Sequence, residues 1–443
     1  MSIPNRFVFD LFAGCGGLST GLEMAGFAPA LVCEIDSDAL GSYLINRHSN
    51  LGNRKFREIK ELHFNDISEL TVDRIESVKM LISELDNSLV FDGKYGSNID
   101  LVCGGPPCQG YSGIGHRRSY SVEKKDLPSN QLFSKMAAFI EQVRPKIFLF
   151  ENVKGILSGK WTSEGSKGEI WADVRARFRK IAGYQVRWSL VHAKDYGVPQ
   201  NRPRVLLVGI RDDIVLSAGL DAEASTEDAI ATGFLPMPTG GAPHPEELLS
   251  DLIDPKVTKA LLTQVFPSDF ATRKYPKDAM TDIQRRLRTL PDGTLLTKGH
   301  EVTEHEYSKH SAKIVTKFKH MLENDGEIPE SMKTKKFAQR VVPTQWGDKG
   351  PTITATSLAD DYVHFSQPRS FSVREWARLQ MFPDWYQFAG KRTTGGLRRA
   401  GNPKEGNFDR ETPKYTQIGN AVPVGLAAAV GRHFNSILDF AES

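Results

Sequence analysis

One cysteine of the chain has surroundings that suit chemistry better than packing. Residues 102–113 read VCGGPPCQGYSG, so Cys108 follows two prolines and has glycines on both sides. Prolines fix the backbone, and glycines leave room for a flat ligand to come close. A thiolate is a good nucleophile, so a cysteine presented in this way is a candidate for covalent catalysis, the alternative being an ordinary structural cysteine.

Two further stretches place ionisable groups beside apolar runs. In FLFENVKG, Glu151 comes near the end of an apolar run, where partial burial would let a carboxyl group donate a proton. In YGVPQNRPRVLLVG, Arg202 and Arg204 are two residues apart before another apolar run, so one would face outward and the other inward. Surface charge is the alternative for the two arginines. Together the two stretches strengthen the catalytic interpretation of Cys108.

A glycine-rich turn near the start of the chain predicts a cofactor loop. DLFAGCGGLS, residues 10–19, follows an apolar run and opens a helical pattern, so its backbone amides and the positive helix end can meet a ligand. Glu34 comes 20 residues after Gly14, where such folds place a carboxylate against ribose hydroxyls. Asp66 would follow a third strand and accept from an adenine amino group. A nucleoside cofactor is favoured over a purely structural turn, and the lack of a GxxxxGK[ST] motif argues against an NTPase.

The elements that must hold these residues alternate along the first half of the chain. Short apolar runs typical of buried strands are separated by helical stretches, which predicts an α/β fold with a parallel, doubly wound sheet and helices on both faces. The expected strands are 6–12, 28–36, 99–105, 146–153 and 204–211, and the expected helices are 17–26, 37–48 and 132–143.

The regular pattern stops near residue 240. LPMPTGGAPHP, residues 235–245, marks a boundary, and residues 241–400 are polar and turn-rich without a clear period. Helical character with an apolar stripe returns over 418–440. Positive charge gathers in this half: residues 271–340 hold 15 Lys and Arg against 10 Asp and Glu, and residues 389–414 hold 7 against 3, although the whole chain is only +3. Solvated surface lysines are the alternative to a polyanion-binding region.

Composition limits the classes of protein that the chain can belong to. A length of 443 residues allows two or three domains, and 40% hydrophobic with 25% charged residues is ordinary globular composition. There is no apolar run of about 18 residues and no signal-peptide pattern, which indicates a cytosolic protein. The four cysteines all lie in the first quarter without a CxxC pair or clustered histidines, so neither a disulfide framework nor a metal site is expected.

With these motifs in order, the sequence closely resembles the DNA (cytosine-5) methyltransferases. It matches their cofactor loop (DLFAGCGGLS), catalytic loop (GGPPCQGYS), ENV strand, QNRPR, the later RSFSVREWARLQMFPD and the closing YTQIGNAVP. The resemblance implies a Rossmann-like S-adenosylmethionine-dependent sheet with a smaller, turn-rich target-recognition domain. It also implies a catalytic large domain over 1–240, a small domain and hinge over 241–400, and a C-terminal segment, 401–443, that returns to the large domain. The basic stretch within 389–414 is longer than is usual between the last two motifs.

The resemblance also assigns roles to individual residues. Cys108 would add to C6 of a flipped cytosine, Glu151 would bind and protonate its N3 edge, and Arg204 would hold O2 with Arg202 in support. The cofactor would be bound by Phe12, Gly14, Gly16, Glu34, Ile35, Asp66, Ile67, Pro106 and Asn420, and the substrate DNA by Gln109, Ser112, His116, Arg117, Arg118 and Gln200, with no metal.

The implied activity is methyl transfer from S-adenosylmethionine to C5 of a cytosine within a specific sequence of double-stranded DNA. Flipping the base out of the duplex would be required, since its C6 is otherwise stacked. The resemblance implies a monomer in the cytoplasm, associated with the nucleoid, with a cognate restriction endonuclease as a further partner or an orphan role. Two rivals stay open: a transfer-RNA cytosine-5 methyltransferase, and a non-catalytic DNA-binding scaffold on the same fold.

Overall fold

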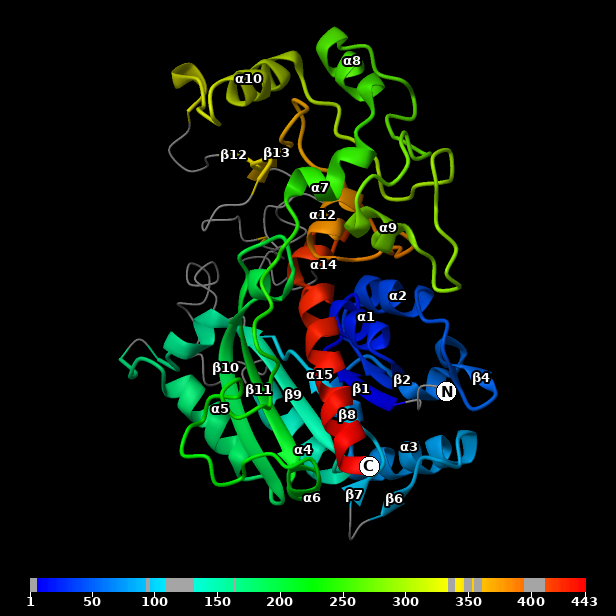
Figure 1. Cartoon of the computed structure of the whole chain (residues 1–443), viewed down its shortest axis with the longest axis vertical. Coiled ribbons are helices and arrows are strands. Elements are labelled where there is room, and N and C mark those ends of the chain that lie inside the picture. The colour runs from blue at the N-terminus through cyan, green and yellow to red at the C-terminus, as the bar shows by residue number, and fades with distance from the viewer. Residues whose placement is uncertain are drawn as a thin grey trace, which may run out of the picture. The chain divides into compact units, whose positions relative to one another are not determined.

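A computed structural model describes residues 6–92, 96–107, 131–162, 164–333, 339–345, 353, 361–393 and 411–443 (Figure 1). The chain divides into two compact units. The first comprises residues 1–195, 203–239 and 426–443, and the second comprises residues 196–202 and 240–425. The chain therefore leaves the first unit twice, once briefly after residue 195 and once for most of its second half.

The first unit is built on a seven-stranded sheet with the order β10-β11-β9-β8-β1-β2-β5. Its central strands are almost completely buried and rich in apolar residues, as expected for strands covered on both faces. The strands are β1 (Arg6–Leu11), β2 (Phe27–Cys33), β5 (His63–Phe64), β8 (Leu101–Gly104), β9 (Ile147–Val153), β10 (Tyr184–His192) and β11 (Pro203–Arg211).

The strand order reverses at β1. From β1 the chain moves outward through β2 to β5, and then returns to the other side of β1 to form β8 and β9. In open α/β sheets, ligands bind outside the carboxyl ends of the strands at such a switch point. The segments after β1 and β8 are therefore the expected position of a site, and they contain the predicted cofactor loop and the segment leading to Cys108.

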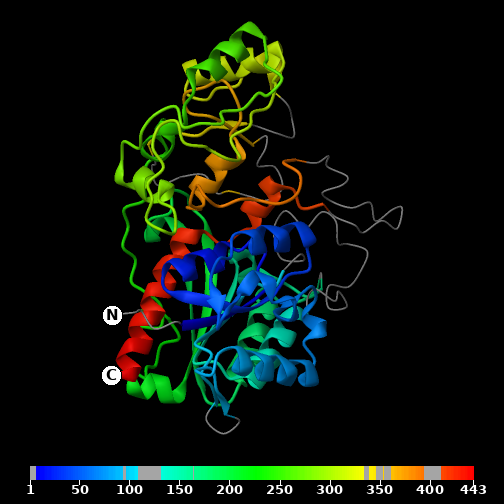
Figure 2. The ribbon, with the colours of Figure 1, turned by 90° about the vertical axis from the view of Figure 1, so that its right-hand side faces the viewer.

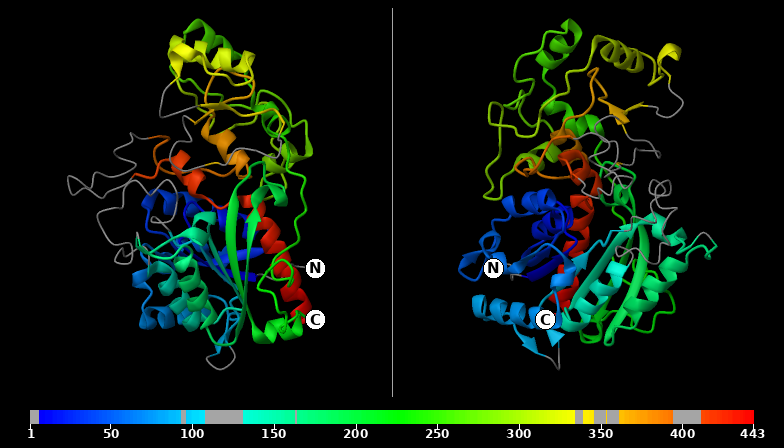
Figure 3. Two further views of the ribbon diagram at one scale, coloured as in Figure 1. Left: turned by 90° about the vertical axis from the view of Figure 1, so that its left-hand side faces the viewer. Right: turned by 180° about the vertical axis from the view of Figure 1, so that it is seen from behind.

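Helices cover both faces of the sheet. Figure 2 shows the sheet close to edge-on with α15 on one side and α3 and α4 on the other, and Figure 3 shows the same layers from the opposite side. Helix α15 packs closely on α1, because a Cβ on Gly431 would lie 2.8 Å from that of Ala25. The helices of this unit are α1 (Gly17–Met24), α2 (Ser37–Ile45), α3 (Val72–Leu85), α4 (Leu132–Val143), α5 (Glu169–Arg179), α6 (Asp212–Ser217) and α15 (Val424–Glu442), which belongs to the unit from Leu426 onward. The unit also has two small antiparallel ribbons, β3 (Asn50–Leu51) with β4 (Arg54–Lys55) and β6 (Phe91–Asp92) with β7 (Gly96–Ser97).

The sheet differs from the predicted parallel one in a single strand direction. Strand β11 is antiparallel to both of its neighbours, β9 and β10, while the other pairs are parallel. Only residues 193–202 join β10 to β11, which is shorter than the dozen or more residues that a parallel crossover needs. The α/β class is confirmed, whereas the all-parallel arrangement was wrong for β11.

The second unit has little regular structure. Its helices and strands are α7 (Pro245–Leu249), α8 (Pro255–Thr263), α9 (Asp282–Arg288), α10 (Ala312–Glu323), α12 (Val373–Leu379), α14 (Lys414–Asn420), β12 (Arg340–Val341) and β13 (Tyr362–Val363). Its interior contains ionic groups as well as apolar side chains. Arg378 is fully buried and binds Asp251 and Asp384 at 2.6 Å each, and Asp251 also pairs with Arg288. Arg369 pairs likewise with Glu375 within the same interior.

These buried pairs come largely from the stretch RSFSVREWARLQMFPD, residues 369–384. Helix α12 begins with a capping box in which Ser372 accepts from the amide of Glu375 and the Glu375 carboxylate accepts from the amide of Ser372. The same carboxylate then pairs with Arg369. Since a buried charge is costly unless it is paired and hydrogen-bonded, this stretch fixes the chain path of the second unit through its charges.

Candidate active site

The loop after β1 has the geometry of a ligand-binding turn. Phe12, Gly14 and Gly16 all have positive φ, of 59°, 56° and 86°. A positive φ is uncommon for phenylalanine and marks a turn that the surrounding structure imposes. The amide of Ala13 donates to the carbonyl of Cys33 at 3.1 Å, which ties the loop to the end of β2. A rigid loop is thus formed at the start of α1.

Glu34 closes this loop from the neighbouring strand. One carboxylate oxygen accepts from the amide of Gly14 at 2.7 Å and the other accepts from the amide of Asp36 at 2.8 Å. Burial raises the pKa of Glu34, although these backbone amides act in the opposite direction. The carboxylate is consequently held at the loop, at the end of β2, where the sequence predicted the ribose contact.

The remaining predicted cofactor residues of the first unit surround the ends of β2, β5 and β8. Ile35 is 73% exposed, which is unusual for a large apolar side chain beside a buried strand. Asp66 caps the short helix Ile67–Glu69, and the amide of Ser68 holds the pKa of Asp66 below its ordinary value. Ile67 is buried in the core, so its side chain contributes packing.

These residues fit a nucleoside cofactor. A Cβ on Gly14 would meet no heavy atom within 4 Å, so open space lies beside the loop. That space adjoins backbone amides, the Glu34 carboxylate and an exposed apolar side chain, which matches the polar and apolar parts of a nucleoside. The individual cofactor contacts stay predictions.

The segment after β8 is pressed between two strands. A Cβ on Gly104 would lie 2.5 Å from the carbonyl oxygen of Leu11, and one on Gly105 would lie 2.6 Å from a carboxylate oxygen of Glu151. Gly104 therefore requires glycine, because the atom that it approaches belongs to the backbone, whereas a side chain at Gly105 would displace the Glu151 carboxylate. Asn152 fixes the next residue by donating from its side-chain amide to the carbonyl of Pro106 at 3.2 Å.

Glu151 and Arg204 form a close pair at this segment. The carboxylate of Glu151 lies 2.5 Å from the Nε of Arg204, and both side chains are almost fully buried. They come from the antiparallel neighbours β9 and β11, in which Glu151 is opposite Leu206 and Arg204 is opposite Val153. An acid and a cation are thus brought together in the same place, and the roles that the sequence assigned to them stay predictions.

The two arginines of QNRPR differ in their surroundings. Arg202 precedes β11, so strand alternation does not apply to it, and it is buried like Arg204 rather than facing outward. It belongs to the second unit, where its guanidinium donates to the carbonyl oxygens of Ile353, Gly419 and Ala421. Its predicted catalytic role stays a prediction.

Gln200 is also buried in the second unit. Its side-chain amide donates to the side chain of Gln380 at 2.7 Å and accepts from the amide of Ile353 at 3.3 Å. Asn420 is exposed at the end of α14. The DNA contact predicted for Gln200 and the cofactor contact predicted for Asn420 are not tested by these placements.

Several predicted site residues fall outside the described residues. They are Cys108, Gln109, Ser112, His116, Arg117 and Arg118. The other three cysteines, Cys15, Cys33 and Cys103, are buried, and burial raises the pKa of each thiol. A raised pKa keeps a thiol protonated and unreactive, so Cys108 is the remaining candidate nucleophile among the four.

Sequence reasoning overlooked residues that support the two loops. Asn152 anchors Pro106, as described above. Of the motif ENV, only Glu151 was predicted from the sequence as a site residue. Arg47 is fully buried after α2 and donates to the carbonyl of Gly16 at 3.2 Å. No sequence signal marks Arg47, because an arginine between Asn and His reads as surface charge.

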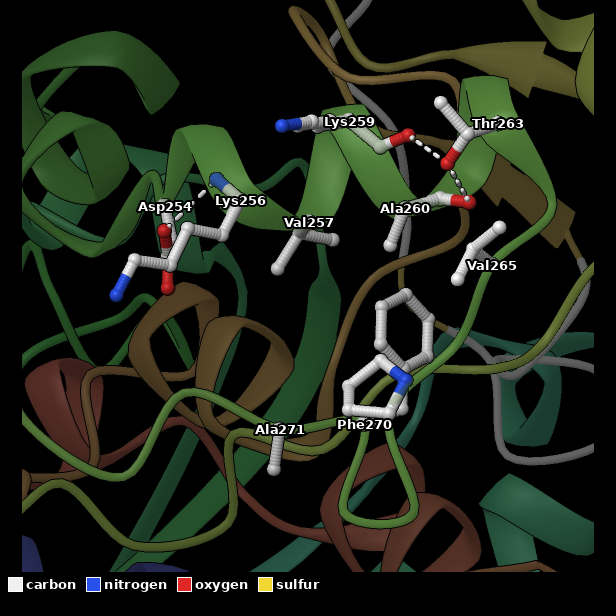
Figure 4. A pocket seen from close by; sticks show the side chains of 10 residues that line it. Asp254, Lys256, Val257, Lys259, Ala260, Thr263, Val265, Phe270 and Ala271 are labelled. Carbon is white, nitrogen blue, oxygen red and sulfur yellow. Dashed lines mark hydrogen bonds between the residues drawn. The ribbon is translucent and has the colours of Figure 1, made fainter.

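A pocket of about 480 Å³ lies within the second unit, along α8. Figure 4 shows Val257 and Ala260 of the helix facing Phe270, while Thr263 bonds back to its own helix. The lining is largely apolar and brings no nucleophile together with a base. In the residues that the structure describes, no cluster of potential ligands suits a metal ion, and no helix is long and apolar enough to cross a membrane.

The fold and these two loops define the class of the protein. A sheet with a switch point, a glycine loop closed by a carboxylate, and a glutamate–arginine pair at the neighbouring segment together describe a Rossmann-like α/β methyltransferase. The chain belongs to the C-5 cytosine-specific DNA methylase family, whose profile matches residues 7–436.

Individual relatives agree with this membership. The chain is 31% identical to the type II methyltransferase M.DdeI of Desulfomicrobium norvegicum, over 97% of this chain and 88% of the relative. It is 30% identical to the type II methyltransferase M.XorII of Xanthomonas oryzae pv. oryzae, over 95% and 82% of the two chains. A crystal structure of an Escherichia coli protein assigned as a prophage-encoded DNA modification methyltransferase has a TM-score of 0.64 at 22% identity, covering 98% of this chain and 100% of that one, and shares the fold.

Proposed function

We propose that the protein transfers a methyl group from S-adenosylmethionine to C5 of a cytosine in double-stranded DNA through a covalent Cys108 adduct. The observation that carries this proposal is the buried pair of Glu151 and Arg204. It lies against Gly105, three residues before Cys108, where an added Cβ would lie 2.6 Å from a carboxylate oxygen of Glu151. An acid, a cation and a nucleophile so arranged suit addition to a pyrimidine ring.

The chemistry begins with the weak nucleophilicity of C5. The thiolate of Cys108 adds to C6, and Glu151 supplies a proton to N3, so that the pair of electrons from the C5–C6 double bond becomes available at C5. Arg204 holds the O2 oxygen of the base and keeps the Glu151 carboxyl in place. C5 then takes the methyl group, and S-adenosylhomocysteine is the leaving group. A base, for which water suffices, removes the C5 proton, the thiolate leaves C6 as the C5–C6 double bond forms again, and the N3 proton returns to Glu151.

S-adenosylmethionine supplies an electrophilic methyl group when it is bound. The loop residues 12–16 would receive its methionine end, Glu34 its ribose and Asp66 its adenine. Pro106, which would also contact the cofactor, is anchored by the side-chain amide of Asn152. Each of these residues thus has a binding or orienting role.

Duplex DNA is the proposed substrate, in preference to transfer RNA. The family is one of DNA methylases, and both relatives described above are named type II methyltransferases. By this analogy the protein works on a specific sequence at the nucleoid, in the cytoplasm, as a monomer and beside a cognate endonuclease. The second unit contains residues 241–400, the small domain to which the resemblance assigns target recognition, but the buried Arg288 is not available for reading the DNA sequence.

A trapping experiment tests the activity. The protein is incubated with labelled S-adenosylmethionine and duplexes that carry cytosine or 5-fluorocytosine, and transfer RNA is included as an alternative acceptor. We expect label in DNA and a stable protein–DNA adduct with the fluorinated duplex, because fluorine at C5 cannot be removed as a proton. DNA binding without an adduct would support the scaffold, and label in transfer RNA alone would support the RNA enzyme.

Two substitutions separate the roles in this mechanism. Cys108→Ala should abolish turnover and adduct formation, because no covalent route then exists. Glu151→Gln should leave a slow residual activity, since general acid assistance is typically worth about 10² to 10⁴ in rate. Equal and mild defects in both variants would contradict the assignment. Bisulfite sequencing of DNA from a host expressing the protein would identify the methylated base and its context.

A further inference from the structure

A buried polar network lies beneath the loop at residues 12–16. Its centre is Arg47, which is fully buried in the first unit after α2. The guanidinium donates to the carbonyl of Gly16 at 3.2 Å, and its Nε lies 2.7 Å from a carboxylate oxygen of Glu23. It also stacks over the ring of Tyr43, with 4.0 Å between the guanidinium carbon and the ring centroid. The guanidinium is therefore held in position by three groups: the Gly16 carbonyl, the Glu23 carboxylate and the Tyr43 ring.

The carbonyl that Arg47 binds occupies a particular position in the loop. Gly16 is the N-cap of α1, has a φ of 86° and has no side chain to cap the helix. Its carbonyl accepts from the amide and from the hydroxyl of Thr20 at 2.8 and 2.7 Å, and Arg47 adds a charged donor. Three donors on one carbonyl fix the peptide plane between Gly16 and Gly17, and with it the left-handed turn.

We propose that Arg47 is a positioning residue that holds the cofactor loop in its binding conformation. The inference rests on the proposed function, because it concerns the loop assigned to the methionine end of S-adenosylmethionine. A fixed loop has less freedom to lose when a ligand binds, so its affinity for the ligand is higher. Arg47 itself is buried below the loop and acts through the backbone.

Arg47→Lys tests this role, because lysine keeps the charge beside Glu23 but lacks the fork that reaches Gly16 at the same time. S-adenosylhomocysteine is titrated into the wild type and the variant by calorimetry, and amide hydrogen exchange is measured over residues 12–18 without ligand. We expect binding weaker by about tenfold, the equivalent of one charged hydrogen bond, together with faster exchange in the loop. The KM for S-adenosylmethionine should rise while the affinity for DNA stays unchanged.

Arg211→Lys is the matched control. Arg211 is a buried arginine of the same unit that binds Asp213 through two bonds of 2.7 and 2.8 Å, at the opposite end of the sheet strands. It should lower the melting temperature without changing the affinity for S-adenosylhomocysteine. If Arg47→Lys lowers only the melting temperature in the same way, Arg47 is merely structural and the proposal is overturned.

A second variant keeps the test decisive if Arg47→Lys does not fold. Thr20→Val preserves shape but removes the hydroxyl that binds both Gly16 and Arg47. It should weaken S-adenosylhomocysteine binding by a smaller factor, and an unchanged affinity would overturn the proposal. A wild-type protein that does not bind S-adenosylhomocysteine at all would instead refute the proposed function.

Discussion

Replacing Gly105 by alanine should move the catalytic carboxylate while leaving the fold intact. The added Cβ would lie 2.6 Å from Oε2 of Glu151, against an ordinary contact distance of roughly 3.5 Å. The carboxylate must therefore move by roughly 1 Å, away from its 2.5 Å contact with Arg204. A displacement of this size at a reacting group costs about 10²-fold in rate.

The assay is single-turnover methylation of duplex DNA at saturating concentrations of both substrates. Gly105→Ala should slow the chemical step by about 10²-fold with little change in the affinity for S-adenosylhomocysteine or in the melting temperature. Gly104→Ala is the neighbouring control, since its Cβ would lie 2.5 Å from a backbone oxygen of Leu11. It should destabilise the sheet, because a backbone atom of a central strand cannot turn aside as a side chain can.

The reasoning would be refuted by a Gly105→Ala enzyme with the wild-type rate. Such a result would mean that the segment does not set the position of the carboxylate, or that Glu151 takes no part in the chemical step. A large loss of cofactor affinity would point instead to the other loop.

Three further predictions concern the supporting groups. Glu34→Ala should weaken S-adenosylhomocysteine binding by at least about tenfold in calorimetry, since the variant leaves the amide of Gly14 without its carboxylate; unchanged affinity would remove Glu34 from the ribose site. Burial raises the pKa of Asp10 to about 6, so the folded state holds this proton more tightly than the unfolded chain does, and stability is lost as the pH rises through that value. Between pH 5 and 8 the free energy of unfolding of the wild type should fall relative to Asp10→Asn by roughly 1 kcal/mol in urea titrations, and a constant difference would contradict this. Arg288→Met leaves Asp251 with one partner fewer and should lower stability by about 3 kcal/mol without changing the salt dependence of DNA binding, whereas a slope lower by about one would mean a phosphate contact.

Sequence patterns were sufficient to predict the buried strands, because burial requires a run of apolar residues. The bounds of the strands β1, β2, β8, β9 and β11 all lie within three residues of the predicted ones, because each strand is a largely apolar segment. Strand direction was not readable in this way, and β11 is antiparallel because a short connection precedes it. Strand β10 and helix α3 were not predicted: the first alternates as an end strand does, and the second buries only Ile75, Val78 and Ile82.

Some residues of the candidate site could be predicted from the sequence, and others could not. Glu151, Arg204 and Glu34 could be predicted because each is an ionisable residue beside an apolar run. Arg47 and Arg288 could not be distinguished from surface residues, since a buried arginine and a solvated one have the same letter and the same charge. Their burial depends on acidic partners that are close in space, such as Glu23 for the first and Asp251 for the second.

Leu11 and Gly104 are direct partners in the parallel pair of β1 and β8, and this register has a consequence for how activity is lost. The cofactor loop and the segment leading to Cys108 leave neighbouring parallel strands at the same height, so their spacing is that of adjacent strands, about 4.8 Å. The pairing is made of backbone hydrogen bonds, so the sheet sets the spacing of the two segments for as long as the two central strands stay paired. In the proposed mechanism, the separation of methyl donor and acceptor would therefore be set by the sheet.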